Sequence, residues 1–167
     1  WLCRLSSDQD MRVKSLNINN LRNIVSTQIE PDSCLNCFIG DNGAGKTSIL
    51  EALSVLSKGR SFRSGQISSL VGPEDKFFQI VTKVETQAGD SHQMGMERGA
   101  DYWSARHNGE DITQLSELTQ LLPHVLLEPS SHTLVSGPPD GRRKYLDWGV
   151  FHVKHDYLLL WKKITLN

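Results

Sequence analysis

The sequence lacks any apolar run near the roughly 20 residues that a membrane-spanning helix needs, and it lacks an excess of either charge. The formal net charge is −1, so affinity for nucleic acid would have to come from local basic patches. We expect no membrane association. The 167 residues are 38% hydrophobic and 22% charged, which is ordinary for a globular protein with one core.

Cysteine is also scarce. The three cysteines are Cys3, Cys34 and Cys37, an odd number that gives no disulfide framework and indicates reduced thiols in the cytoplasm. Cys34 and Cys37 form a C-x-x-C, but no second Cys or His pair stands at zinc-ligand spacing. Packing of Cys37 as a small hydrophobic residue is favoured over a redox or metal role. The histidines also lack metal spacing and are interpreted as surface or core residues: His107, His124 and His132.

The two ends of the chain fit poorly with what lies between them. Residues 1–10 lack the features of a signal peptide, and a strand-like pattern begins at Met11. We interpret residues 1–10 as an upstream extension and residues 11–167 as an incomplete portion of one domain. The final segment, "HDYLLLWKKITLN", resembles an amphipathic helix that has just begun.

Hydrophobic periodicity predicts a mixture of strands and helices. Strands are expected at Met11–Leu21, Ile24–Glu30, Leu35–Ile39, Phe78–Glu85, His92–Met96, Tyr102–His107 and Val125–Pro129. A helix is expected at Thr47–Lys58, with a stop at Gly59 and a buried stripe of Ile49, Leu50, Leu53 and Leu56. Further helices are expected at Leu115–Leu122 and from Asp140 onward, the latter with Tyr145, Leu146, Trp148 and Phe151 facing a core.

The strongest signal is the stretch Gly40-Asp41-Asn42-Gly43-Ala44-Gly45-Lys46-Thr47, which matches G-x-x-x-x-G-K-[ST] at every fixed position. Its glycines allow a tight turn that directs backbone N–H groups at phosphate oxygens, and the following helix adds its positive end. Lys46 would bridge the β- and γ-phosphates, and the Thr47 hydroxyl would coordinate Mg²⁺. We predict an ATP and Mg²⁺ site here.

Hydrolysis requires more than this loop. A P-loop hydrolase also uses a carboxylate at the end of another apolar strand to organise Mg²⁺ and water. Glu128 is the one candidate, and the proline that follows favours a strand-to-loop exit instead. We expect the acidic strand to lie beyond residue 167, so no catalytic residue is assigned.

Four stretches together resemble one family. "NGAGKTSILEAL" is similar to the ABC-type ATPase heads of the SMC and RecF group, and "SLNINNLRNI" resembles their opening strand. "GRSFRS" and "EPSSHTLVSGPPDGRRKYLDWGVFH" resemble the RecF family in particular. The order and spacing of the four agree from Met11 to about Trp161. The chain is thereby identified as a member of the RecF family, without its signature motif and Walker B strand.

The resemblance implies a fold and a function. The fold is an ABC-type P-loop ATPase head: a mixed α/β fold with a flanking antiparallel sheet. The function is ATP-dependent DNA binding in bacterial replication, recombinational gap repair and SOS induction, in which RecO and RecR are partners and RecA is loaded. Family members form homodimers on ATP and hydrolyse it slowly, so the expected device is a dimerisation switch on DNA.

The resemblance also places Arg22 and Asn23 near the nucleotide, where Arg22 could pair with phosphate. Arg60 and Arg63 in the loop after the phosphate-loop helix are candidate DNA or regulatory contacts, with Phe62 packed in the core. Three cations at a helix N-terminus oppose its dipole and are candidate DNA or arm-domain contacts, although a structural role is favoured there: Arg142, Arg143 and Lys144. Asp147 is expected to pair with an arginine.

Two other function classes stay open at this point. A small P-loop kinase would need a second-substrate pocket and a basic lid, and "GRSFRSG" follows the first helix too soon to serve as one. A chain that binds nucleotide or a protein partner without turnover is the other alternative.

Overall fold

The computed structural model describes residues 11–127, 129–154, 156–157, 161 and 163. It divides into two compact units, residues 1–124 and 125–167, and each is described by itself. Residues 1–10, which we predicted to lie outside the fold, fall outside the described ranges, as does most of the last predicted helix.

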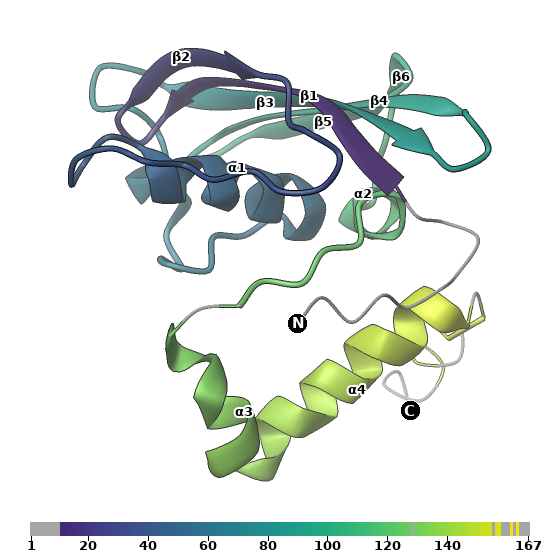
Figure 1. The fold of residues 1–167 in the computed structure, drawn as a ribbon. Helices are drawn as coiled ribbons and strands as arrows, with labels where there is room; N and C mark the ends of the chain where they lie inside the picture. Colours follow the sequence, from purple (N-terminus) through teal and green to yellow (C-terminus); the bar gives the residue numbers. More distant parts are fainter. Residues whose placement is uncertain (1–10, 128, 155, 158–160, 162, 164–167) are drawn as a thin grey trace. The chain divides into compact units, whose positions relative to one another are not determined.

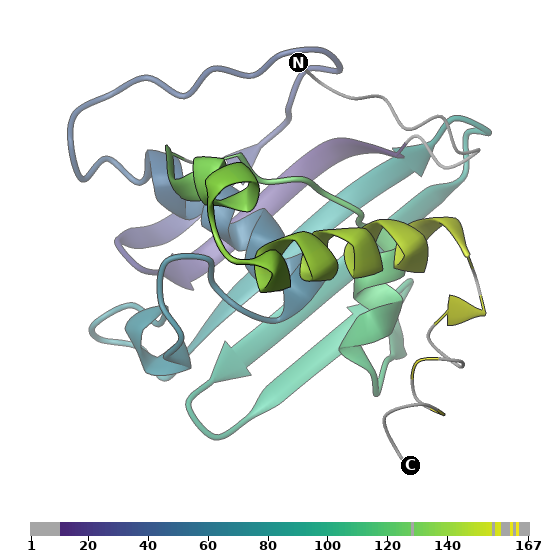
Figure 2. The same cartoon turned by 90° about the horizontal axis from the view of Figure 1, so that it is seen from below.

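The first unit is built on one antiparallel sheet of six strands in the order β2-β1-β3-β4-β5-β6. The strands are β1 (Met11–Leu21), β2 (Ile24–Ile29), β3 (Phe77–Thr86), β4 (Ser91–Gly99), β5 (Trp103–His107) and β6 (Glu110–Asp111). Figure 1 shows α1 (Lys46–Lys58) and α2 (Leu115–Leu121) beneath one face of this sheet, and Figure 2 shows the same face with both helices in front of it.

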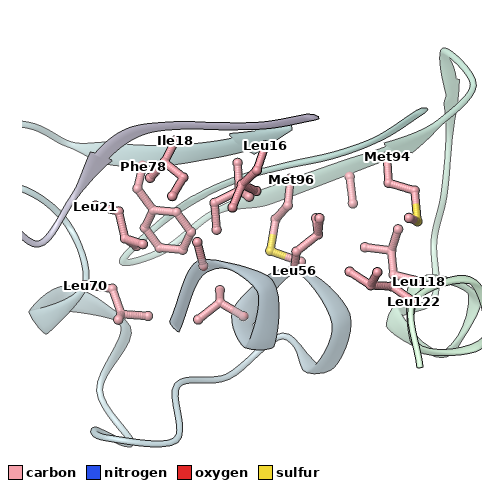
Figure 3. Packing of buried hydrophobic residues seen from close by; sticks show 14 of the residues in the cluster. Leu16, Ile18, Leu21, Leu56, Leu70, Phe78, Met94, Met96, Leu118 and Leu122 are labelled. Atoms are coloured by element: carbon pink, nitrogen blue, oxygen red, sulfur yellow. The ribbon is translucent and has the colours of Figure 1, made fainter. Parts of the chain in front are cut away.

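Alternation along the strands creates the core. Phe78, Ile80, Thr82 and Val84 of β3 are buried, and Met94 and Met96 of β4 lie opposite them. Side chains with period two point to the same face of a sheet, so these residues meet α1 and α2. The core also holds Leu16, Ile18, Leu21, Val55, Leu56, Leu70 and Leu118 (Figure 3).

Local chemistry explains two irregular points. The register of β1 shifts between Val13 and Ser15, which indicates a β-bulge. At this bulge the hydroxyl of the buried Thr82 donates a hydrogen bond to the carbonyl oxygen of Ser15 at 2.7 Å. Asn108 and Gly109 adopt positive φ of 52° and 87°, which is typical of the type I′ turn of a tight hairpin. Asn and Gly suit this turn because both tolerate a positive φ.

Two predicted strands are wrong. Residues 35–39 and 125–127 form no strand in the described ranges, and Leu35 and Ile39 are 81% and 89% exposed. An apolar run becomes a buried strand only where neighbouring strands pair with it, and residues 35–39 have no pairing partner among the described strands. Cys37, expected to pack in that strand, is exposed like Cys34.

The helix after the phosphate loop begins at Lys46 and ends at Gly59, close to the prediction. Its buried face matches the predicted stripe in part. Leu56 is buried and Ile49 and Leu53 pack partly buried against the core, but Leu50 is 44% exposed. The fully buried residues of α1 also include Ser48, Glu51, Ala52 and Val55.

The second unit contains η2 (Pro129–His132), α3 (Thr133–Ser136) and α4 (Pro139–Val153). The predicted helix from Asp140 is confirmed, but its predicted core face is only partly covered, and α4 has no fully buried residue. Tyr145 and Leu146 are 49% and 64% exposed, whereas Trp148 and Phe151 are half-buried. Asp147 accepts a hydrogen bond from Tyr157 at 2.7 Å rather than pairing with an arginine.

Candidate nucleotide-binding site

The phosphate loop lies between residue 39 and the first turn of α1. Gly43 and Gly45 have φ of 86° and 89°, a left-handed conformation that strains residues with a side chain. Gly45 is the N-cap of α1 and has no side chain that could cap the helix. The first N–H groups of α1 are therefore available to an external acceptor, and the helix dipole favours an anion there.

Lys46 spans the loop that precedes it. Its ammonium donates to the carbonyl oxygens of Gly40 and Asp41, both at 2.7 Å. An ammonium has three N–H donors, so Lys46 can keep both contacts and donate a third hydrogen bond to a phosphate oxygen. The loop and its lysine are thus mutually positioned before any ligand arrives.

A hollow of about 650 Å³ opens beside the loop. The loop contributes residues Asn42 to Ser48, and three positive side chains line or span the same place: Arg22, Lys46 and Arg63. Positive charge around a site that is also a helix N-terminus suits a polyphosphate. The hollow is open, and Thr47 is exposed.

The structure brings Arg22 and Asn23 to this hollow, as predicted, but it gives both side chains protein partners. Arg22 donates from Nη2 and Nε to Glu51 at 2.8 and 3.1 Å, and from Nη1 to Ser69 O at 2.6 Å. Asn23 donates to the carbonyl of Gly43. A phosphate role for Arg22 stays a prediction, and it would require sharing the guanidinium with Glu51.

Glu51 is the residue that sequence reasoning missed. Its side chain is fully buried, accepts a hydrogen bond from the Ser61 hydroxyl, and lies 3.5 Å from Nη1 of Arg63. Burial alone would raise the pKa of Glu51, but hydrogen bonds from Arg22 and Ser61 and the charges of Arg22 and Arg63 outweigh it and lower the pKa. The available signal was its place on the small-residue face of α1, three residues after Ser48 and four before Val55.

The predicted DNA contacts fall in different places. Arg60 is exposed and Arg63 lines the phosphate-loop hollow, while Phe62 is half-buried between them. Arg142 donates to Gly137 O at 3.0 Å within the second unit. In the same helix Arg143 pairs with Asp140 at 3.1 Å, and Lys144 is exposed.

The candidate carboxylate Glu128 lies outside the described residues. Within the part of the chain that the structure describes, no group of three or more His, Cys, Asp and Glu residues could hold a metal. The same part contains no helix long and apolar enough to cross a membrane.

Comparison with known proteins agrees with this geometry. A family model described as "AAA ATPase domain" matches residues 11–96, which is just over half of the chain and includes the whole phosphate loop and α1. The chain belongs to this family. The predicted fold class, a mixed α/β ATPase head with a flanking antiparallel sheet, is confirmed at this level.

The predicted resemblance to RecF is also confirmed. The chain is 39% identical over 157 residues to the DNA replication and repair protein RecF of Xanthomonas axonopodis pv. citri (strain 306), covering 92% of this chain and 43% of that protein. It is 40% identical over 160 residues to RecF of Stenotrophomonas maltophilia (strain R551-3), covering 93% and 44%. The chain thus spans less than half the length of these curated relatives.

A solved structure of the recombination mediator protein RecF-ATP in the RecFOR pathway has a similar fold. It superposes with a TM-score of 0.79 at 25% identity and covers 93% of this chain and 42% of that one. The similarity extends across the family model's range and beyond it.

Proposed function

We propose that this AAA ATPase domain binds ATP with Mg²⁺ at the hollow beside residues 40–47. The observation that carries the proposal is the position of Lys46, whose ammonium bridges two loop carbonyls at the N-terminus of α1. Backbone N–H groups from Gly43 to Thr47 would surround the β-phosphate, and Lys46 would reach the β- and γ-phosphates. Mg²⁺ would neutralise phosphate charge, and the hydroxyl of the exposed Thr47 would coordinate it.

The test is Lys46→Ala in the full 167-residue chain, measured by equilibrium titration with Mg-ATP. A charged hydrogen bond contributes about 1.5–3 kcal/mol, so affinity should fall roughly 10- to 100-fold. Lys83→Ala is the matched control, because Lys83 is an exposed lysine of β3, and it should leave affinity unchanged. Equal binding by the wild type and Lys46→Ala would contradict the site.

We further propose that ATP acts here as a switch for assembly on DNA, in the manner that the RecF relatives suggest. The loop's outer rim is open: Gly40, Asp41, Asn42, Gly43 and Ala44 are all exposed. A second surface could therefore cover the phosphates, as in a homodimer formed on ATP. Single-stranded, gapped or junction DNA and RecR with RecO are the proposed partners of the whole protein.

The DNA contacts belong to this proposal as well. Arg60 and Arg63 follow α1 directly and are the first candidates, because Arg63 also borders the hollow. Arg142, Arg143 and Lys144 are the second group. If the switch operates, Mg-ATP should strengthen binding to a gapped DNA duplex, and Lys46→Ala should remove that increase while leaving nucleotide-free binding as it was.

Binding of ATP without turnover has its own support. A hydrolase needs a free carboxylate near Mg²⁺ and the attacking water. Glu51 is the buried acid beside the hollow, and two arginines and a serine hold it. Its carboxylate is already bound by Arg22, Arg63 and Ser61 and is not free to contact Mg²⁺ or water. We therefore propose that the described residues bind ATP and that hydrolysis requires a carboxylate from another segment.

A further inference from the structure

The turn between β1 and β2 is anchored to several other segments beside the phosphate loop. Arg22 has a φ of 58°, a left-handed conformation that costs a residue with a side chain about 1 kcal/mol or more. The conformation persists because the turn is held from several sides. Arg22 N donates to Leu70 O at 2.7 Å, and its guanidinium binds both oxygens of the buried Glu51.

Asn23, the next residue, reaches from this turn to the phosphate loop. Its amide nitrogen donates to the carbonyl of Gly43, and its amide oxygen accepts from the hydroxyl of Ser48 at 3.3 Å. A backbone carbonyl can only accept, so the nitrogen must face Gly43. Ser48, which is 4% exposed in the first turn of α1, then fixes the other end of the amide.

These contacts hold one peptide group at both ends. The carbonyl of Gly43 is bound by Asn23, and the N–H of Ala44, in the same peptide plane, donates to Asp41 O at 3.2 Å. This plane joins Gly43 to Ala44, and a glycine on one side of it allows many backbone conformations. Without Asn23, the plane would be held from one side only, by the bond from Ala44 N to Asp41 O.

The same turn also packs against Gly45. A β-carbon at Gly45 would lie 3.2 Å from Cγ1 of Ile24 and 3.7 Å from Oδ1 of Asn23. The turn therefore forms a close wall behind the loop as well as a hydrogen-bonding partner. Loop, turn and first helical turn are locked together around one asparagine side chain.

We propose that Asn23 is a positioning residue for nucleoside triphosphate: it preorganises the phosphate loop through the Gly43 carbonyl and does not itself bind the phosphates. This inference rests on the proposed ATP site and gives a specific role to Asn23, which the family resemblance placed near the nucleotide. Preorganisation lowers the entropy lost when a flexible loop closes on its ligand. Its removal should weaken binding while leaving the phosphate-binding groups in place.

Two substitutions separate the hydrogen bond from the space it fills. Asn23→Ala removes both contacts, and Asn23→Asp keeps the size but replaces the donor with an oxygen that faces the Gly43 carbonyl. We expect the affinity for Mg-ATP to fall about 3- to 10-fold in Asn23→Ala and further in Asn23→Asp. Asn19→Ala is the matched control, because Asn19 is an asparagine of β1 with one side-chain bond, to Gln79 at 3.3 Å. It should bind as the wild type does.

A second measurement distinguishes positioning from a general loss of stability. In ¹⁵N spectra of the folded ligand-free chain, the amides of Gly43 and Ala44 should broaden or shift in Asn23→Ala, while those of β4 should stay unchanged. Urea unfolding of each variant shows whether it is still folded under the conditions in which its affinity is measured.

The outcomes separate this inference from the function on which it rests. If Lys46→Ala loses affinity while both Asn23 variants bind like the wild type, the positioning role is wrong and the ATP site stands. If the wild type itself does not bind Mg-ATP, the proposed function fails first. Unchanged Gly43 and Ala44 amides in Asn23→Ala would also overturn the inference.

Discussion

Glu51 connects three segments through one carboxylate. It binds Arg22 from the β1–β2 turn, and it contacts Ser61 and Arg63 from the loop after α1. Its side chain is fully buried, whereas Arg22 and Arg63 are 20% and 47% exposed. A buried charge that loses its partners is costly, so the pair with Arg22 should matter more to folding than an exposed ion pair would.

Glu51→Gln should therefore lower the free energy of unfolding by about 3 kcal/mol, because the guanidinium of Arg22 is left without its counter-charge. Urea unfolding at pH 7 measures this change. Glu85→Gln is the control: Glu85 pairs with Lys14 at 2.8 Å but is 38% exposed, and such pairs contribute about 0–1 kcal/mol. Equal losses in the two variants would contradict the role given to Glu51.

The same carboxylate gives a pH dependence. The folded-state pKa of Glu51 lies below the ordinary value of 4.5, so the folded state stabilises the ionised form. Its contribution is complete above that ordinary value and is lost as the pH falls through the lowered folded pKa. Between pH 7 and acid, Glu51→Gln should lose less stability than the wild type, and parallel curves would contradict this.

At the residue scale, the sequence was most informative at positions where the backbone conformation or the ligand chemistry permits few residue types. The glycines, Lys46 and Thr47 could be assigned because only their residue types fit a phosphate loop. The partners of Arg22 and Asn23 could not, since they come from segments 20 to 47 residues away. The order of residue types along the chain does not tell which buried acid forms an ion pair with a given arginine.

Among the elements, α1 shows how close packing sets the sequence. It ends at Gly59, which has a φ of 67° and whose N–H donates to Val55 O, a typical helix C-terminus. A β-carbon on Gly59 would lie 2.3 Å from Cδ1 of Leu115. Gly59 is therefore required both for its conformation and for the contact of α1 with α2.

Substitution of two glycines separates these requirements. Gly89→Ala should cost about 1 kcal/mol, because Gly89 has a φ of 91° but no atom near its missing β-carbon within 4 Å. Gly59→Ala should cost a further 1–3 kcal/mol, approximately, from the overlap with Leu115. Urea unfolding of both variants measures the difference, and equal costs would show that Leu115 moves away freely.

The predicted elements succeeded or failed for a consistent reason. The strands β3, β4 and β5 pair with sequence neighbours through short turns, so hydrophobic periodicity was enough to find them. Residues 35–39 and 125–127 have the same apolar character but no strand partner in the described ranges. Hydrophobicity alone predicted a strand there, whereas pairing decides whether one forms.

At the scale of the whole molecule, the phosphate loop and its supporting turn belong entirely to the first unit. The AAA ATPase domain match covers the same region. Three of the four motifs that carry the RecF resemblance lie in this first unit, and the fourth lies in the second unit. The exposure of α4 could not be predicted, because the spacing of its apolar residues is that of a helix with one face in a core. In the structure, α4 has no fully buried residue.

The most direct test of the ATP site is hydrogen exchange of the full chain with and without Mg-ATP, followed by mass spectrometry of peptides. Bound phosphates should slow exchange in residues 43–49 and in the turn at Arg22 and Asn23, with no change in α4. Protection absent from residues 43–49, or confined to another part of the sheet, would contradict a nucleotide site at the phosphate loop.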